Sequence, residues 1–100
     1  MLSYNYPNKK GELIMETIEI NKKAVSLLEQ WDPFGKGEKA YELEIVDVLE
    51  ELHRLDHPAD LAKKIREIYE HSYEMWIPIE KCVQISYKLI AIKFEAKCIV

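Results

Sequence analysis

Apolar residues along this chain recur mostly at steps of three and four, which is the period of an amphipathic helix. These stripes predict helices over residues 16–30, about 39–55, 58–73 and 79–94. We find no run in which apolar and polar residues alternate for the length of a half-buried strand. The connections between the stripes are short, so consecutive helices should be antiparallel neighbours. The sequence therefore predicts an all-α fold, an up-and-down bundle of four helices with short loops.

Prolines and glycines separate the predicted helices. Pro33, Gly35 and Gly37 end the first one. Pro58 ends the second, because the residue before a proline is pushed away from helical geometry. The same proline is well placed in the first turn of the third helix, where its missing N–H costs nothing. Pro78 separates the third helix from the fourth.

Each predicted helix has one stripe that should face the core. The four stripes comprise Ile18, Ala24, Val25, Leu27, Leu28 and Trp31; Tyr41, Ile45, Val48, Leu52 and Leu55, widened by Val46 and Leu49; Leu61, Ile65, Ile68, Tyr69, Ser72 and Tyr73; and Ile79, Cys82, Val83, Ser86, Leu89 and Ile90.

Residues 1–14 are expected to lie outside the folded domain, which would span residues 15–100. The stretch KKGE can be encoded by a purine-rich ribosome-binding sequence, and Leu-Ile then forms an ordinary spacer before Met15. One hypothesis is therefore a disordered leader that is not translated in the native protein. The alternative is a genuine polar extension that frays.

Charge and hydropathy narrow the possible partners. The formal net charge is −4 at pH 7, and the basic residues are scattered. Binding to nucleic acid requires clustered Lys and Arg, and anionic membranes attract the same kind of cluster. The chain has no apolar run near the roughly 18 residues of a membrane-spanning helix, and no signal-peptide pattern. We predict a cytoplasmic protein that binds neither nucleic acid nor membrane.

The densest motif, WDPFGKG over residues 31–37, is interpreted as a structural corner between the first two helices. Its expected anchors, with the tyrosine that follows, are Trp31, Pro33, Gly35, Gly37 and Tyr41. Trp31 and Tyr41 continue buried stripes, Pro33 favours a turn, and the glycines allow positive φ values. A phosphate site is disfavoured, because the dinucleotide-binding motif needs three glycines between a strand and a helix.

Carboxylates in the second predicted helix suggest a docking surface. Glu44, Asp47 and Glu51 follow at steps of three and four, so they should share a face of that helix. The simpler interpretation is that these carboxylates form a solvent-exposed outer face without a binding role. The functional interpretation is a surface for a basic protein partner, with Asp32 and Phe34 contributing from the adjoining loop.

Candidate metal and catalytic groups are sparse. His53 and His57 are four residues apart, but a proline follows at once and no third ligand is evident. Glu50 and His53 match half of a di-metal helix motif that has no second copy. The sequence predicts no metal, no cofactor and no catalytic residue. Cys82 and Cys98 lack a CxxC spacing and should be reduced thiols, with Cys82 buried.

A family resemblance emerges from the motifs together. The Trp-Asp-Pro-Phe-Gly block, a proline opening the third helix with IYE, and IP-E-C in the fourth resemble the YugE-like family of small proteins from bacilli. The match runs from about Met15 to the C-terminus. It implies an all-helical bundle and no assigned activity.

Three hypotheses for function follow. The first is a non-enzymatic interaction module that binds a basic partner through the acidic second helix. The second is a small-ligand-binding protein or enzyme with a pocket at the Trp31 loop, using Asp32, Tyr41 and His53. The third is a homodimer through the third and fourth helices, which would bury the aromatic residues of the second half of the chain. Those residues are Tyr69, Tyr73, Trp76 and Tyr87.

Overall fold

The computed structural model describes the backbone of residues 5–98 and the side chains of residues 17–95. Within residues 5–98 the chain forms no strand and four α-helices, one of which follows a short 3-10 helix. The helices are α1 (Asn5–Trp31), η2 (Glu38–Tyr41), α2 (Glu42–Arg54), α3 (Pro58–Tyr73) and α4 (Ile79–Cys98). This confirms the prediction of an all-α protein with four helices.

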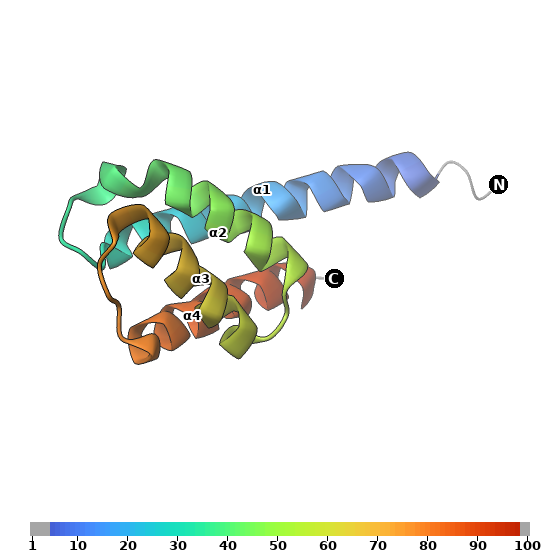
Figure 1. Cartoon of the computed structure of the whole chain (residues 1–100). Helices are drawn as coiled ribbons and strands as arrows, with labels where there is room; N and C mark the ends of the chain where they lie inside the picture. Colours follow the sequence, from blue (N-terminus) through green and yellow to red (C-terminus); the bar gives the residue numbers. More distant parts are fainter. Residues whose placement is uncertain (1–4, 99–100) are drawn as a thin grey trace.

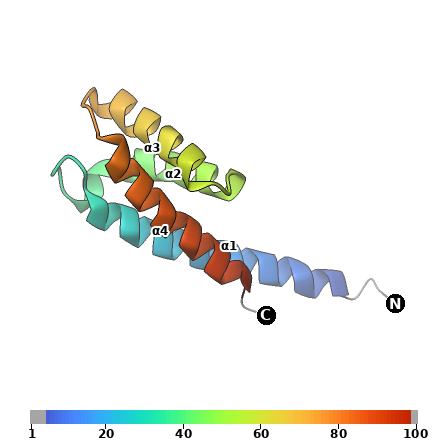
Figure 2. The ribbon, with the colours of Figure 1, turned by 90° about the horizontal axis from the view of Figure 1, so that it is seen from below.

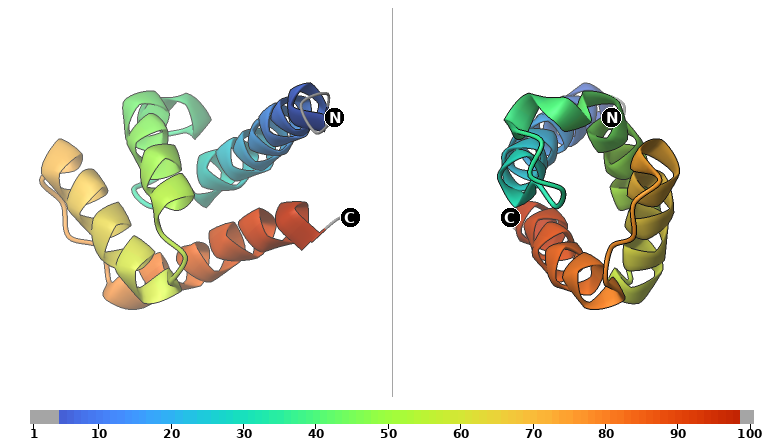
Figure 3. Two further views of the ribbon diagram at one scale, coloured as in Figure 1. Left: turned by 90° about the vertical axis from the view of Figure 1, so that its right-hand side faces the viewer. Right: turned by 60° about the vertical axis from the view of Figure 1, so that its left-hand side comes forward.

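The helices form a closed bundle (Figures 1 and 2). Each one packs against its neighbours in sequence, and α4 completes the ring by packing against α1. Figure 3 shows the ring in its right-hand view, where α1, α2, α3 and α4 follow one another around the bundle. The core lies inside this ring. The first half of α1 projects beyond the other helices in Figure 1.

The boundaries of α3 agree with the sequence signals. Pro58 occupies the first turn, and Asp60 places a negative charge near the positive end of the helix. The helix ends at Tyr73, and the residue that caps it, Glu74, has a left-handed φ of 52°. The N–H of Glu74 donates to the carbonyl of Glu70 at 2.7 Å, which satisfies one carbonyl of the last turn.

The two terminal helices are longer than predicted. We expected a disordered leader over residues 1–14, but α1 extends back to Asn5. Extending an existing helix costs little, because each added residue gains one hydrogen bond, and Pro7 lies in the first turn where proline is tolerated. Residues 1–4 lie outside the described residues. The hypothesis that residues 1–14 are not translated in the native protein stays a prediction. At the other end α4 continues past Phe94 to Cys98.

Most of the predicted buried residues do form the core, with three exceptions. Ile18, Val46 and Ser72 are exposed, whereas Ile20 is buried in the place expected for Ile18. Helical periodicity gives the direction of a stripe but not its width. Because α2 packs more extensively on α3 than on α1, Val46 on the opposite edge of α2 remains in solvent.

A buried lysine joins α4 to the end of α2. The side chain of Lys93 is 2% exposed. Its ammonium donates to the carbonyls of Leu52 at 2.7 Å and Leu55 at 2.8 Å, and to Asp56 Oδ1 at 2.9 Å. These carbonyls are acceptors that the helix itself cannot satisfy at its C-terminus. Lys93 therefore serves as a C-terminal cap of α2 supplied by another helix.

Candidate functional site

The loop after α1 is organised around the carboxylate of Asp32. It accepts hydrogen bonds from the N–H of Lys36 at 2.8 Å, the N–H of Gly37 at 3.1 Å and the hydroxyl of Tyr41 at 2.5 Å. The bond from Tyr41 is the largest cause that lowers the pKa of Asp32, and backbone N–H groups add to it. The carboxylate proposed for a partner is thus already used inside the loop.

Tyr41 holds the other side of the loop. It is fully buried, and its hydroxyl accepts the N–H of Phe34 at 3.1 Å and that of Lys36 at 3.4 Å. Gly35 and Gly37 have φ values of 67° and 103°, which residues with a Cβ rarely adopt. The loop therefore has its own hydrogen-bond network and its own backbone requirements.

Five aromatic rings gather at this end of the bundle. Trp31 meets Tyr69 edge-on at 5.2 Å between centroids. Phe34, the other loop residue proposed for partner binding, packs its ring against Tyr73 at 5.2 Å. Tyr41 lies 5.5 Å from Tyr69 and 5.4 Å from Tyr73. Such contacts stabilise the packing beyond simple burial, and they anchor the loop on α3.

The polar groups of the hypothetical loop pocket do not converge. Asp32 and Tyr41 bond to each other, but His53 lies near the C-terminal end of α2. There its Nε2 and the Oδ1 of Asn21 are 2.8 Å apart, which links α2 to α1. The three residues therefore cannot act together on one ligand in this arrangement.

The predicted acidic face of α2 is divided by the fold. Glu44 is only 9% exposed and Glu51 is mostly buried, whereas Asp47 is exposed. Glu44 and Glu51 are two turns apart, on the edge of α2 that turns towards α3. Glu51 is paired with Arg54 at 3.2 Å. The expectation of a single solvated face was wrong, because α3 packs close enough to cover two of its three carboxylates.

A different surface of α2 is open. Leu43 is 78% exposed and Val46 is 54% exposed, although both are large apolar residues. Glu42, Asp47 and Glu50 are exposed beside them. We call these five residues the α2 outer surface. Positions 43, 46, 47 and 50 follow at helical steps, so their side chains share one side of the helix.

A polar contact between Asn21 and His53 links α1 to the C-terminal end of α2. Val25 of α1 and Leu49 of α2 are both half-buried and pack against the core. Sequence periodicity alone had assigned Val46 to the core as well, but the fold leaves it exposed.

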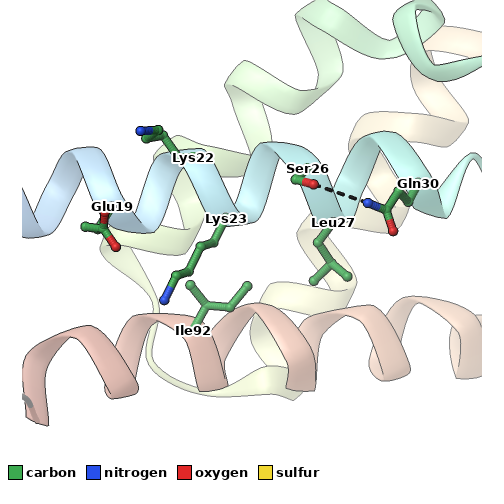
Figure 4. A pocket seen from close by; sticks show the side chains of 7 residues that line it. All are labelled: Glu19, Lys22, Lys23, Ser26, Leu27, Gln30 and Ile92. Atoms are coloured by element: carbon green, nitrogen blue, oxygen red, sulfur yellow. Dashed lines mark hydrogen bonds between the residues drawn. The ribbon is translucent and has the colours of Figure 1, made fainter.

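A shallow groove runs between α1 and α4 (Figure 4). Its volume is about 450 Å³, and it is lined by α1 residues between Glu19 and Gln30 together with Ile92 of α4. Leu27 and Ile92 point into it from the two helices, and Lys23 reaches across towards Ile92. Because one acidic and two basic side chains border this groove, its charge does not select one class of ligand.

Several aromatic side chains remain outside the core. Trp76, in the connection between α3 and α4, is 70% exposed, and the guanidinium of Arg66 lies 6.0 Å from its ring centroid. Tyr87 and Phe94 are exposed on α4. In contrast Tyr69, which we had assigned to a dimer interface, is fully buried within the monomer.

Two observations concern metal and thiol chemistry in the described part of the chain. Among its side chains, no group of three or more His, Cys, Asp or Glu residues is arranged to hold a metal ion. Burial raises the pKa of the Cys82 thiol to about 11, so the reactive thiolate is scarce near neutral pH. No helix in this part is long and apolar enough to cross a membrane.

Comparison with known proteins now adds the family. The model of a domain of unknown function, DUF1871, matches residues 23–99. The chain belongs to this family. It is also 36% identical over 84 residues to the uncharacterized protein YugE of Bacillus subtilis (strain 168), which covers 84% of this chain and 98% of that protein. The resemblance to YugE-like proteins is thereby confirmed.

A solved structure agrees with the fold. The crystal structure of APC36109 from Bacillus stearothermophilus superimposes with a TM-score of 0.75 at 31% identity. It covers 77% of this chain and 95% of its own. The similarity supports the helical bundle.

Proposed function

We propose that this DUF1871 family member is a non-enzymatic, cytoplasmic interaction module. Its α2 outer surface binds a basic protein partner. The single observation that carries the proposal is the exposure of Leu43 and Val46 between the exposed carboxylates of Glu42, Asp47 and Glu50. Isolated exposed apolar residues are common, but an apolar pair with a rim of one charge is typical of a recognition surface.

The chemistry of this surface suggests its partner. Leu43 and Val46 can be buried in an apolar pocket of the partner. This burial contributes to affinity in proportion to the apolar area removed from water. The surrounding carboxylates favour a partner with Lys and Arg at its rim, because complementary charge raises the association rate and suppresses wrong partners. Residues 43–50 span only about 10 Å along the helix axis. A stable interface must therefore extend beyond the α2 outer surface itself.

The earlier set of partner-binding residues is revised accordingly. Asp47 stays in the proposal. Asp32 is bonded to Tyr41, and Phe34 packs against Tyr73 of α3. Glu51 is paired with Arg54, and Glu44 is mostly buried. Leu43, Val46 and Glu50 take their place, because a partner can reach them without any change in the fold.

The proposal is tested by affinity capture from the source organism with three forms of the full chain. One is wild type, one carries Asp47→Lys and Glu50→Lys, and one carries Glu67→Lys and Glu80→Lys. The last pair is exposed on α3 and α4 and changes the net charge equally. A recovered protein is then purified and its affinity measured at two salt concentrations.

The expected result is a basic protein that binds wild type and the α3/α4 control but loses most of its affinity for the α2 variant. Binding should also weaken as salt rises, since exposed charges are screened. A recovered protein that binds all three forms equally would refute the α2 outer surface as the docking site. So would a partner whose affinity falls equally with both charge-reversed forms.

A second candidate function is a homodimer through α3 and α4. Its support is the exposure of Trp76, Tyr87 and Phe94, since large aromatics are enriched at interfaces. Sedimentation of the full chain at micromolar concentration tests it. A monomer at these concentrations would remove this candidate.

A further inference from the structure

A narrow stripe on the outer side of α4 carries no charge. It consists of Gln84, Tyr87, Ala91 and Phe94, all of which are exposed. Tyr87 is 62% exposed and Phe94 is 42% exposed, although both carry large aromatic rings. The positions follow at steps of three, four and three residues, so the side chains form one line along the helix. We call these residues the α4 stripe.

The exposed side of the neighbouring helix α3 has a different character. Its exposed residues include Asp60, Lys63, Lys64 and Glu67, as is usual for a surface that faces water. Single exposed apolar residues need no explanation. A line of uncharged residues at alternating steps of three and four, however, is the spacing of the contact line between two paired helices. The α4 stripe thus has the pattern of a helix-pairing surface.

Two charged residues border the α4 stripe on one side. Lys88 and Glu95 are exposed and seven residues apart, so they lie two turns apart on the same side of α4. Within the described residues, neither of them forms an ion pair. A rise of about 10 Å separates them along the helix axis, which is too far for them to pair with each other. Both charges are therefore open to a partner.

The aromatic pair and the charged pair are both centred on Ala91. The midpoint of Tyr87 and Phe94 lies between residues 90 and 91, and that of Lys88 and Glu95 lies between residues 91 and 92. These midpoints differ by one residue, or about 1.5 Å along the axis. A second α4 that runs antiparallel and crosses at Ala91 therefore brings Tyr87 to Phe94 of the second copy and Lys88 to Glu95 of the second copy. By twofold symmetry each contact occurs twice.

We propose that the α4 stripe binds a second copy of this chain, with the two α4 helices antiparallel and crossing at Ala91. This inference rests on the second candidate function, the homodimer through α3 and α4, and narrows its interface to α4. The small side chain of Ala91 lets the two helices approach closely at the crossing point. A parallel pair is disfavoured, because it would place Lys88 beside Lys88 and Glu95 beside Glu95, and charges that flank a helix pair select its orientation.

The proposed arrangement defines which residues lie outside the interface. Because α4 ends at Cys98, a second α4 that crosses at Ala91 reaches back only to the level of Gln84. Lys81 and Trp76 precede that level, so neither is part of the contact. The α2 outer surface lies across the ring from α4 in Figure 3, so a basic partner and a second copy can bind at the same time.

The test is sedimentation equilibrium of the full chain from about 1 to 100 μM, a range suited to a short interface of this kind. The variants are Lys88→Glu, Glu95→Lys and the double exchange of both charges. Lys81→Glu is the matched control, since Lys81 is exposed on the same helix and its charge change equals that of Lys88→Glu. Thermal unfolding followed by circular dichroism verifies that each variant is folded.

We expect wild type to form a reversible dimer. Each single variant turns two attractions into two repulsions, so its dimer should dissociate at least about tenfold more readily. The double exchange and an equimolar mixture of the two single variants should both restore dimers, because opposite charges then meet again. Lys81→Glu should behave as wild type.

Three results would overturn the proposal, and they can be told apart. A monomeric wild type would remove both the α4 pair and the second candidate function. A dimer of equal stability in all forms would refute the α4 pair alone and leave a homodimer through another surface. A double exchange that fails to restore the dimer would refute the antiparallel pairing of Lys88 with Glu95. None of these results bears on the α2 outer surface, which is tested separately.

Discussion

Lys93→Met should be among the most damaging single substitutions at a polar position. Methionine keeps the apolar stem and its packing against the core but removes the ammonium. The carbonyls of Leu52 and Leu55, at 2.7 and 2.8 Å, then lose a charged donor at the buried end of α2. A hydrogen bond to a charged group contributes about 1.5–3 kcal/mol.

The expected net loss is about 3 kcal/mol in the free energy of unfolding. Two such bonds at the lower end of that range give this value. The pairing with Asp56 adds little, because that carboxylate is 61% exposed and solvent screens it. The lower end of that range is used because relief from the cost of burying the ammonium offsets a part of the loss. For a chain of this size, the thermal midpoint should fall by roughly 12–24 °C.

Urea denaturation followed by circular dichroism at 222 nm measures this loss. Lys88→Met is the matched control, since Lys88 is exposed on the same helix and the charge change is identical. The control should stay within about 0.5 kcal/mol of wild type. A Lys93→Met protein that loses less than about 1 kcal/mol, or a control that loses as much, would refute the argument that the ammonium caps α2.

Two further predictions concern the loop after α1. Gly37→Ala should lower the free energy of unfolding by about 1–3 kcal/mol, because a backbone with φ 103° and ψ 157° is almost exclusive to glycine. Gly35→Ala should lower it less, because the φ of 67° at Gly35 lies in the left-handed region, where a Cβ causes milder strain. An added Cβ would meet open space at both positions, so backbone strain alone determines the two losses. A larger loss for Gly35→Ala than for Gly37→Ala in urea denaturation would contradict this prediction. The pKa of Asp32 is lower in the folded state than its ordinary value of 3.8. The ionised carboxylate therefore stabilises the fold above pH 3.8, and this stabilisation is lost as the pH falls through the folded pKa. Asp32→Asn should therefore flatten the acid side of the stability profile below about pH 4, and an unchanged slope would show that the loop network does not depend on the charge.

Local sequence determined the helices and most of their buried sides. Periodicity at three and four residues located all four helices, and Pro58 marked both the end of α2 and the start of α3. These features depend on the backbone and on neighbours within one or two turns. They can be read without knowing which helix packs against which.

Lys93 illustrates a feature that was visible in the sequence but not interpreted. It is in phase with the buried residues Cys82, Ser86 and Leu89, so periodicity places it on the core side of α4. A lysine on the buried side of a helix indicates one of two things. Either the buried side is assigned wrongly, or a hydrogen-bond acceptor inside the protein receives the ammonium. The acceptors are carbonyls some forty residues away in sequence, and only the packing of α4 against the end of α2 brings them within reach.

The candidate sites depended on tertiary structure even more strongly. Spacing placed Glu44, Asp47 and Glu51 on one side of α2, and that placement on the helix was sound. The fold then buried most of Glu44 and left Asp47 in solvent. A sequence pattern defines directions around a single helix axis, whereas burial depends on the distance to the neighbouring helix. For this reason the sequence by itself established an acidic second helix, and only the packing of α2 between α1 and α3 separated the exposed residues Leu43, Val46 and Asp47 from the mostly buried Glu44.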